Sequence, residues 1–286
     1  MITVSVPGKI HLMGEHAVVY GKPAILAAIN KRLTVTVEGG ASNTTGYVAD
    51  ILQIVQTHFK QTKPMRLTIH SEIPEGYHLG SSAAVAVAVV AAASYYLKKV
   101  WNPALFNQLA YEAEKLKHGN PSGGDNTVVT MGGLIWYRKE LEFLKSIWQL
   151  PFKTKLHNFF LLDTGKPKET TGDMVAYVAK QKNLQHHFDE NEVQTKRIAV
   201  ALKENDEQTL IDAIRKGERT LEAMGVVSGK AKKIIRTIED GGGAAKILGG
   251  GGRAKGVGYL LCYSHIPPRS ALPITLGEEG VRLEHR

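Results

Sequence analysis

The feature of this chain that most restricts its fold is a glycine- and serine-containing turn that runs directly into a long alanine-rich stretch. Gly76 and Gly80 omit side chains where a backbone must bend or approach a ligand closely. The stretch at residues 82–99 is long and rich in alanine, which favours a buried helix over a strand. Unpaired N–H groups and the positive dipole end of such a helix attract phosphate. Ser81 and Ser82 stand at this helix start, so the segment either binds phosphate or caps the helix with a serine.

Apolar residues elsewhere alternate with strand-like and helix-like spacing. Pro7-Gly8 is expected to end the first strand, which would place Lys9 at a strand mouth. The irregular alternation of strands and helices is typical of an α+β protein. The 286 residues suit two domains, which we expect at 1–150 and 151–286. We expect strands near residues 2–6, 33–37, 65–70, 134–137, 158–163 and 259–263, and helices near residues 48–59, 82–99, 103–117, 171–205 and 207–224.

Composition and charge restrict the partners and the compartment. The net charge of +9 suits either a nucleic acid or an anionic small molecule, but no dense basic block occurs, so we expect no nucleic-acid partner. The most apolar stretch, residues 83–93, is too short to cross a bilayer, and the N-terminus lacks the layout of a signal peptide. Cys262 is the single cysteine and cannot form an internal disulfide, which fits a reducing compartment. The sequence therefore predicts a cytoplasmic location and no membrane partner.

Three polar residues follow the first strand closely. Lys9 is suited to offset charge on a phosphate or on a substrate oxygen. Glu15 and His16 stand between a glycine and a small residue, where a polar substrate can reach them. The competing interpretation is a strand-to-loop connection with a surface lysine and a histidine that has a purely structural role.

Two carboxylates flank a glycine-containing loop. Glu114 lies near the end of an expected helix, and Asp125 follows the loop at residues 119–124. In a phosphoryl-transfer site, one carboxylate can hold Mg²⁺, which prefers oxygen ligands, while the other contacts the nucleophilic hydroxyl. The competing interpretation is two solvated acids near loops.

A second glycine-rich segment, residues 249–252, can approach a substrate or a phosphate closely, although such runs also form flexible surface loops. The chain lacks the P-loop, the Gly-x-Gly-x-x-Gly dinucleotide-binding pattern, the paired-histidine zinc motif and the serine nucleophile elbow. One cysteine cannot build a thiolate zinc site. If the turn at residues 76–82 binds phosphate, it therefore does so through a motif of a different type.

In this order, the segments resemble the superfamily of galactokinase, homoserine kinase, mevalonate kinase and phosphomevalonate kinase, and within it the mevalonate kinase family. The resemblance implies two α+β domains of the GHMP kinase fold with the active site in the cleft between them. It implies ATP-dependent phosphorylation of the primary hydroxyl of mevalonate in isoprenoid biosynthesis, with Mg²⁺ as cofactor, in a homodimer. The matching segments are PGK at residues 7–9, GEHAVVYGKPA at 14–24, LGSSAA at 79–84, HGNPSGGDN at 118–126 and the glycines at 249–252.

The resemblance also implies roles for individual residues. Asp125 matches the residue that takes the proton from the substrate hydroxyl, and Lys9 matches the residue that stabilises the developing charge. Ser82 and Glu114 match the Mg²⁺ ligands. The residues implied in ATP binding are Gly76, His78, Leu79, Gly80, Ser81 and Ser82. The residues implied in mevalonate binding are Glu15, His16 and Thr164.

Three positions depart from the family pattern, and one of them is Gly250, where the family usually has alanine. His78 stands where the phosphate loop usually has glycine, and its side chain could crowd the nucleotide or add a hydrogen-bond donor. Leu248 stands where the family usually carries a serine or threonine hydroxyl that faces the phosphates. Two alternatives therefore stay open: a kinase for another small hydroxy acid or phosphorylated intermediate, and a family member that binds ligand without turnover.

Overall fold

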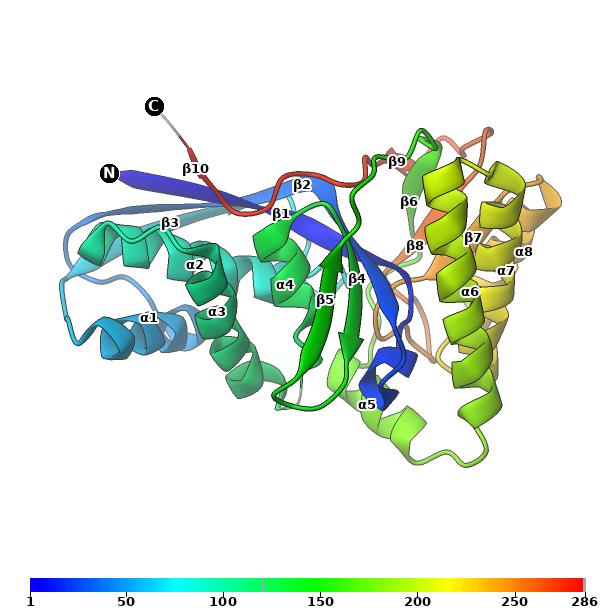
Figure 1. The fold of residues 1–286 in the computed structure, drawn as a ribbon, viewed down its shortest axis with the longest axis horizontal. Coiled ribbons are helices and arrows are strands. Elements are labelled where there is room, and N and C mark those ends of the chain that lie inside the picture. The colour runs from blue at the N-terminus through cyan, green and yellow to red at the C-terminus, as the bar shows by residue number, and fades with distance from the viewer. Residues whose placement is uncertain (120, 285–286) are drawn as a thin grey trace.

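The computed structural model describes residues 1–119 and 121–284. Asn120, which belongs to the segment at 118–126, and the last two residues of the expected second domain lie outside the described residues. Within the described part, the strands form one six-stranded and one four-stranded sheet, and helices pack on both. Figure 1 shows the two sheets side by side, with β1 and β2 extending from one toward the other. The fold is α+β, as the sequence predicts.

The first sheet has the strand order β10-β1-β2-β4-β5, and β3 pairs with a further part of β2. The pairings between these strands are antiparallel. Both ends of the chain meet in this sheet, because Thr3 pairs with Glu284. Its strands are β1 (Ile2–Met13), β2 (Ala24–Gly39), β3 (Met65–Ser71), β4 (Leu134–Lys139), β5 (Lys145–Gln149) and β10 (Arg282–Glu284).

The second sheet has the order β7-β8-β6-β9 and is also antiparallel. Its strands are short and almost continuously apolar at β6 and β8, because helices and the other strands bury them. Its members are β6 (Phe159–Asp163), β7 (Ala244–Ile247), β8 (Tyr259–Tyr263) and β9 (Leu272–Pro273).

The helices divide between the sheets. Helices α2 and α4 pack on β1 and β2, α1 and α3 pack on α2, and α7 and α8 pack on β7. Helix α6 packs along α7 and also contacts β1, so it joins the two halves. The helices are η1 (Ala17–Tyr20, a 3₁₀ turn), α1 (Gly46–Phe59), α2 (Ser81–Lys98), α3 (Pro103–His118), α4 (Gly124–Met131), α5 (Thr171–Ala179), α6 (Gln185–Glu204), α7 (Glu207–Ala223) and α8 (Gly229–Asp240).

Helix α2 is the central helix of the first half. Its alanine and valine side chains are buried from residue 86 to residue 93 without interruption, because the small side chains allow the sheet and three helices to pack closely around it. By length and composition alone α2 could cross a membrane. The apolar composition of α2 is explained by its burial in the core of the first half. The prediction of a buried helix starting at the glycine-serine turn is confirmed.

The expectation that Pro7-Gly8 ends the first strand is wrong. Strand β1 continues to Met13 and accommodates these residues with a register shift between Pro7 and Gly8. A proline cannot donate to the strand ladder, but a bulge absorbs this defect while both faces stay buried. Lys9 therefore lies inside a strand and not at its mouth.

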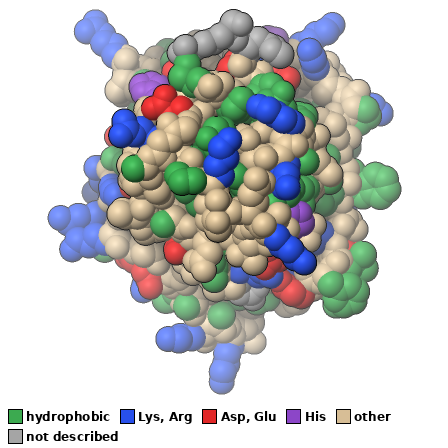
Figure 2. All heavy atoms as spheres, turned by 90° about the vertical axis from the view of Figure 1, so that its left-hand side faces the viewer, with side chains coloured by type: hydrophobic (Ala, Val, Ile, Leu, Met, Phe, Trp, Pro, Cys, Tyr) green, Lys and Arg blue, Asp and Glu red, His purple; other side chains and the backbone are tan. Residues whose placement is uncertain are grey.

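The sequence patterns also missed several elements. The first half of β2 is buried on both faces, so it lacks the alternation that marked residues 33–37. Helices α4 and α8 and strands β5, β7, β9 and β10 were not expected. Figure 2 views the end of the molecule where both termini lie, and the Lys and Arg side chains there are dispersed among other types. The boundary at residue 150 stays a prediction, and β10 returns the end of the chain to the first sheet.

Candidate active site

A cavity of about 590 Å³ brings the predicted segments together. Its lining comes from β1, the 76–82 loop, α2, α3 and α4 on one side, and from residues 166–176 and 249–250 on the other. Both halves of the chain therefore contribute to it. The predicted site residues that line the cavity are Lys9, Glu15, His16, Gly76, His78, Gly80, Ser81, Ser82, Glu114 and Asp125.

A lysine and a carboxylate form an ion pair in this cavity. Lys9 Nζ lies 2.9 Å from Asp125 Oδ2, and the side chains are 3% and 35% exposed, respectively. The ammonium is thus enclosed, while the carboxylate is open to a ligand. Burial acts to raise the pKa of Asp125, but the neighbouring groups, first among them the Lys9 ammonium through its charge and its hydrogen bond, together hold this pKa below the ordinary value. Asp125 is therefore ionised at neutral pH and can accept a proton or a hydrogen bond.

A histidine adjoins this pair. His11 Nδ1 lies 3.3 Å from Lys9 Nζ. Burial, assisted by the Lys9 charge, holds the pKa of His11 well below its ordinary value, so the ring is neutral. The neutral ring accepts a hydrogen bond from the ammonium and adds no competing positive charge. The Lys9 ammonium is consequently fixed between His11 and Asp125.

A serine hydroxyl and a buried carboxylate meet at the start of α2. Ser82 Oγ donates to Glu114 Oε2 at 3.2 Å, and Tyr47 donates to Glu114 Oε1 at 2.7 Å. His118 Nε2 lies 3.1 Å from Ser82 Oγ. Glu114 is 3% exposed, and its burial raises its pKa above the ordinary value, an effect that the Tyr47 hydrogen bond opposes. A cation bound here would stabilise the ionised carboxylate.

These two oxygen ligands fit Mg²⁺ bound to a nucleotide. Among the described residues, no group of three or more His, Cys, Asp or Glu side chains could hold a metal ion. Mg²⁺ typically takes one or two protein ligands and fills its remaining positions with phosphate oxygens and water. Ser82 and Glu114 supply a hydroxyl and a carboxylate of that kind, at the cavity wall and beside a helix start.

Within the described residues, three helices begin at the cavity. Gly80 is the N-cap of α2, Gly123 is the N-cap of α4, and Thr170 is the N-cap of α5. All three residues line the cavity. Each helix start carries partial positive charge and N–H groups without partners in the helix. Since Gly80 is the cap, Ser81 and Ser82 lie within the first turn of α2 and do not cap it. The cavity is therefore suited to a polyanion.

Close contacts with neighbouring side chains explain why the 76–82 loop has glycine at two positions. Gly80 has φ 78°, and a Cβ there would come within 2.6 Å of the Lys9 side chain. Gly76 has φ 82°, and a Cβ there would come within 2.5 Å of the Lys166 side chain. The loop also contacts β1 through its backbone, because Lys9 N donates to Leu79 O at 3.0 Å. These glycines let two lysines reach the cavity.

Glu15 forms a buried ion pair with Lys246 of β7. Lys246 is fully buried, and its ammonium also donates to the carbonyls of His11 at 3.2 Å and Ile247 at 2.6 Å. The three donors of the lysine are thus occupied. This pair joins the segment after β1 to the second sheet, so it holds the two walls of the cavity together.

The remaining predicted residues lie as follows. His16 Nε2 lies 3.2 Å from Gly250 O, across the cavity. Leu79 is buried, and its carbonyl supports Lys9. The Thr164 hydroxyl donates to Gly258 O at 2.7 Å and accepts from Val257 N at 2.8 Å. Neither Leu79 nor Thr164 is among the lining residues, and the contact of Thr164 with substrate stays a prediction.

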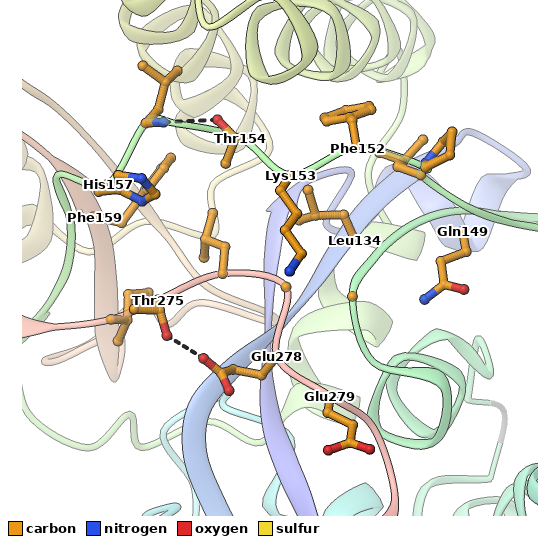
Figure 3. A pocket seen from close by; sticks show the side chains of 17 residues that line it. Leu134, Gln149, Phe152, Lys153, Thr154, His157, Phe159, Thr275, Glu278 and Glu279 are labelled. Atoms are coloured by element: carbon orange, nitrogen blue, oxygen red, sulfur yellow. Dashed lines mark hydrogen bonds between the residues drawn. The ribbon is translucent and has the colours of Figure 1, made fainter.

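A second cavity, of about 770 Å³, lies between the segment after β5 and the segment before β10. Figure 3 shows Lys153 extending into it and Glu278 and Glu279 on the opposite wall. The Thr275 hydroxyl donates to Glu278 Oε1 at 2.5 Å. None of the predicted site residues lines this cavity, and no helix start points polar groups into it among its described lining. The smaller cavity is therefore the candidate active site.

The sequence reasoning missed three contributors to the site. His11 follows Lys9 by two positions, and strand periodicity puts such residues on the same face, so an uninterrupted strand would have predicted it. Lys166 follows the expected strand at 158–163 and lines the cavity. Lys246 directly precedes the glycine segment, but its burial and its pairing with Glu15 depend on the tertiary fold.

Comparison with known proteins shows the family to which the chain belongs. Residues 46–133 match the family model described as GHMP kinases N terminal domain. A mevalonate kinase from Archaeoglobus fulgidus is 31% identical over 98% of this chain and 99% of its own length. The chain belongs to the mevalonate kinase family. A further mevalonate kinase, from Thermococcus gammatolerans, is 29% identical over 88% of this chain and 86% of its own length.

Solved structures of this superfamily share the fold. The structure of L. major mevalonate kinase in complex with R-mevalonate superposes with a TM-score of 0.77 at 25% identity, covering 92% of this chain and 86% of that one. A Streptococcus pneumoniae phosphomevalonate kinase in complex with phosphomevalonate and AMPPNP also gives 0.77, at 21% identity and 93% of each chain, which shows the fold alone. The predicted GHMP kinase fold is therefore confirmed.

Proposed function

We propose that the protein transfers the terminal phosphoryl group of ATP to the primary hydroxyl of mevalonate and forms 5-phosphomevalonate for isoprenoid biosynthesis. Membership of the mevalonate kinase family supports this activity. The observation that carries the proposal is the Lys9–Asp125 pair at 2.9 Å, placed in a cavity where three helices begin. The pair suits an alcohol that loses a proton, and the helix starts suit a triphosphate.

The reaction requires a bond to form between the hydroxyl oxygen and the γ-phosphorus while the bond to the leaving ADP oxygen breaks. Asp125 accepts the hydroxyl proton, for which its low pKa keeps it ionised. Lys9 stabilises the negative charge that develops on the oxygen. His11 and the Leu79 carbonyl fix the position of Lys9 through its side chain and its backbone. Catalysis of this kind consists mainly of positioning and charge stabilisation.

Ser82 and Glu114 would hold Mg²⁺, which supplies neutralisation of the phosphate charge when it is bound. Tyr47 orients the Glu114 carboxylate from the side opposite Ser82. We further propose contacts with ATP for the 76–82 loop, namely Gly76, His78, Leu79, Gly80, Ser81 and Ser82, and contacts with mevalonate for Glu15, His16 and Thr164. The support for these contacts is the position of most of these residues at the cavity wall.

A substrate panel tests the proposed function. Purified protein with ATP and Mg²⁺ is given mevalonate, phosphomevalonate, homoserine or galactose in turn, and ADP formation is followed by a coupled assay. We expect ADP only with mevalonate. ADP formed with a different acceptor would reassign the substrate within the superfamily. Nucleotide binding by calorimetry without turnover on any acceptor would refute the kinase activity and leave a ligand-binding member.

The compartment and the assembly stay proposals. We propose a cytoplasmic homodimer that binds small molecules and has neither nucleic acid nor membrane as partner. The dispersed basic side chains in Figure 2 support the absence of a nucleic-acid partner on that face. Sedimentation equilibrium would test the dimer, and a salt-dependent gel shift would test nucleic-acid binding.

A further inference from the structure

His78 has an unusual backbone conformation in the 76–82 loop. Its φ is 64°, in the left-handed region that residues with a Cβ rarely adopt. Such a conformation persists only where surrounding contacts hold it, and it often marks a functional position. Glycine would adopt this backbone conformation more easily, so the contacts of the His78 side chain must stabilise it here.

The imidazole of His78 joins three segments of the chain. Its Nε2 lies 3.2 Å from Gly251 O, and its Nδ1 lies 3.4 Å from Thr171 Oγ1. The ring also packs directly on Gly249, where an added Cβ would come within 2.9 Å of the His78 side chain. The 76–82 loop of the first half is thereby connected to the 249–252 segment and to the start of α5.

The protonation state fits these contacts. Burial, assisted by the nearby Lys9 charge, lowers the pKa of His78 to about 4. The ring is therefore neutral at pH 7, with one nitrogen that donates and one that accepts. Nε2–H donates to the Gly251 carbonyl, and Nδ1 accepts from the Thr171 hydroxyl. The same ring thus satisfies both partners without adding a charge to the cavity.

A second histidine, His16, makes the same kind of contact with the neighbouring carbonyl of the 249–252 segment. His16 has φ 58°, and its Nε2 lies 3.2 Å from Gly250 O. Two imidazoles from the first half, both on residues with a positive φ, therefore contact consecutive carbonyls of the 249–252 segment. The two contacts connect the cavity wall formed by the first half to the 249–252 segment on the opposite wall.

We propose that His78 is a positioning residue that ties the 76–82 loop to the 249–252 segment and thereby shapes the nucleotide end of the active site. This proposal rests on the proposed kinase function for its kinetic consequence. The imidazole donates to the Gly251 carbonyl, so any contact of His78 with ATP falls to its main chain or to the remaining surface of the ring. Its side chain packs on Gly249, toward the opposite wall of the cavity.

The test compares His78→Ala, His78→Gly and His78→Asn. Loss of the hydrogen bonds should raise the KM for ATP about fivefold to tenfold in the alanine and glycine variants, while the KM for mevalonate stays within about twofold. Asparagine tolerates left-handed backbone and keeps an N–H donor, so it should restore part of the loss. Hydrogen exchange of the Gly251 and Gly252 amides in the ligand-free protein should become faster in the alanine and glycine variants.

Lys60→Gly is the matched control, because Lys60 also has a left-handed backbone, φ 49°, but ends α1 away from the cavity. It should leave the KM for ATP unchanged. Unchanged ATP KM and unchanged exchange in both His78→Ala and His78→Gly would overturn the proposal, as would equal losses for both substrates. Since the exchange measurement needs no turnover, it tests the His78 contact even if mevalonate proves not to be the substrate.

Discussion

Replacing Asp125 by asparagine preserves the size of the side chain but removes the charge that faces Lys9 at 2.9 Å. An amide cannot take the proton from the acceptor hydroxyl. A positioned acid–base group typically contributes ~10²–10⁴ in rate, which corresponds to about 3–5 kcal/mol of barrier. We therefore expect kcat to fall by roughly this factor in Asp125→Asn. The KM for ATP should change far less, because the helix starts and the 76–82 loop remain in place.

The assay is ADP formation at saturating mevalonate and ATP, followed over time at several enzyme concentrations. Asp240→Asn serves as a matched control, because Asp240 is an exposed residue at the end of α8 and lies outside the cavity lining. Its kcat should equal that of the unchanged protein. An Asp125→Asn variant that folds normally and keeps more than about a tenth of the original kcat would refute the assigned role.

The pH profile gives a second measure of the same group. The pKa of Asp125 is lower than usual in the folded protein, so the carboxylate stays ionised until the pH falls below the ordinary aspartate value of about 3.9. The kcat/KM of the unchanged protein should therefore show no acidic loss from this group between pH 7 and about pH 5. An acidic limb centred near pH 6 that disappears in Asp125→Asn would contradict the assignment.

Three further changes test other parts of the structure. Glu114→Gln should raise the Mg²⁺ concentration needed for half-maximal activity roughly tenfold or more; an unchanged titration would argue against a metal ligand. Lys246→Met leaves the buried Glu15 carboxylate unpaired and should lower the free energy of unfolding in urea by about 3–5 kcal/mol. The control Lys22→Met breaks surface pairs and should lower it by at most about 1 kcal/mol. Equal losses in the two variants would be inconsistent with the buried pair. Leu248→Thr places a hydroxyl in the core, where Leu248 is fully buried, and should lower the free energy of unfolding by about 2 kcal/mol or more without improving ATP affinity. The control Leu272→Thr, at an exposed position, should lower it by less than about 0.5 kcal/mol. Tighter ATP binding by Leu248→Thr would show that position 248 faces the phosphates.

The predictions that succeeded depend on local sequence. The start of α2 followed from glycine, serine and alanine content, because these residues determine where a helix begins and how closely it can pack. The α+β class followed from the alternation of short strands and helices. The convergence of Lys9, Glu114 and Asp125 on one cavity was expected from the resemblance to a kinase family, and the geometry places all three there.

The predictions that failed concern features decided by tertiary packing. The pair Pro7-Gly8 usually ends a strand, but burial on both faces carried β1 through it with a register shift. Helix α4, which carries Asp125, is a short element containing valine and threonine, so its local propensity does not indicate a helix. The Glu15–Lys246 pair joins residues far apart in the sequence, and no spacing rule connects them.

Leu248 illustrates a limit of family comparison. The resemblance implies a hydroxyl at this position that faces the phosphates, and the leucine suggested a weakened nucleotide site. In the structure the Leu248 side chain belongs to the main hydrophobic core and does not line the cavity. The change therefore adds apolar burial, and the shape of the 249–252 segment depends on its backbone and on the histidines that contact it.

A crystal structure with mevalonate and a nonhydrolysable ATP analogue would test the central claim most directly. The measured quantity is the distance from the primary hydroxyl oxygen to Asp125 Oδ2 and to Lys9 Nζ. We predict hydrogen-bond distances of about 2.6–3.2 Å to Asp125 and contact with Lys9, with the γ-phosphorus in line on the other side of the oxygen. A hydroxyl bound away from this pair, or a nucleotide whose phosphates do not reach the start of α2, would contradict the account.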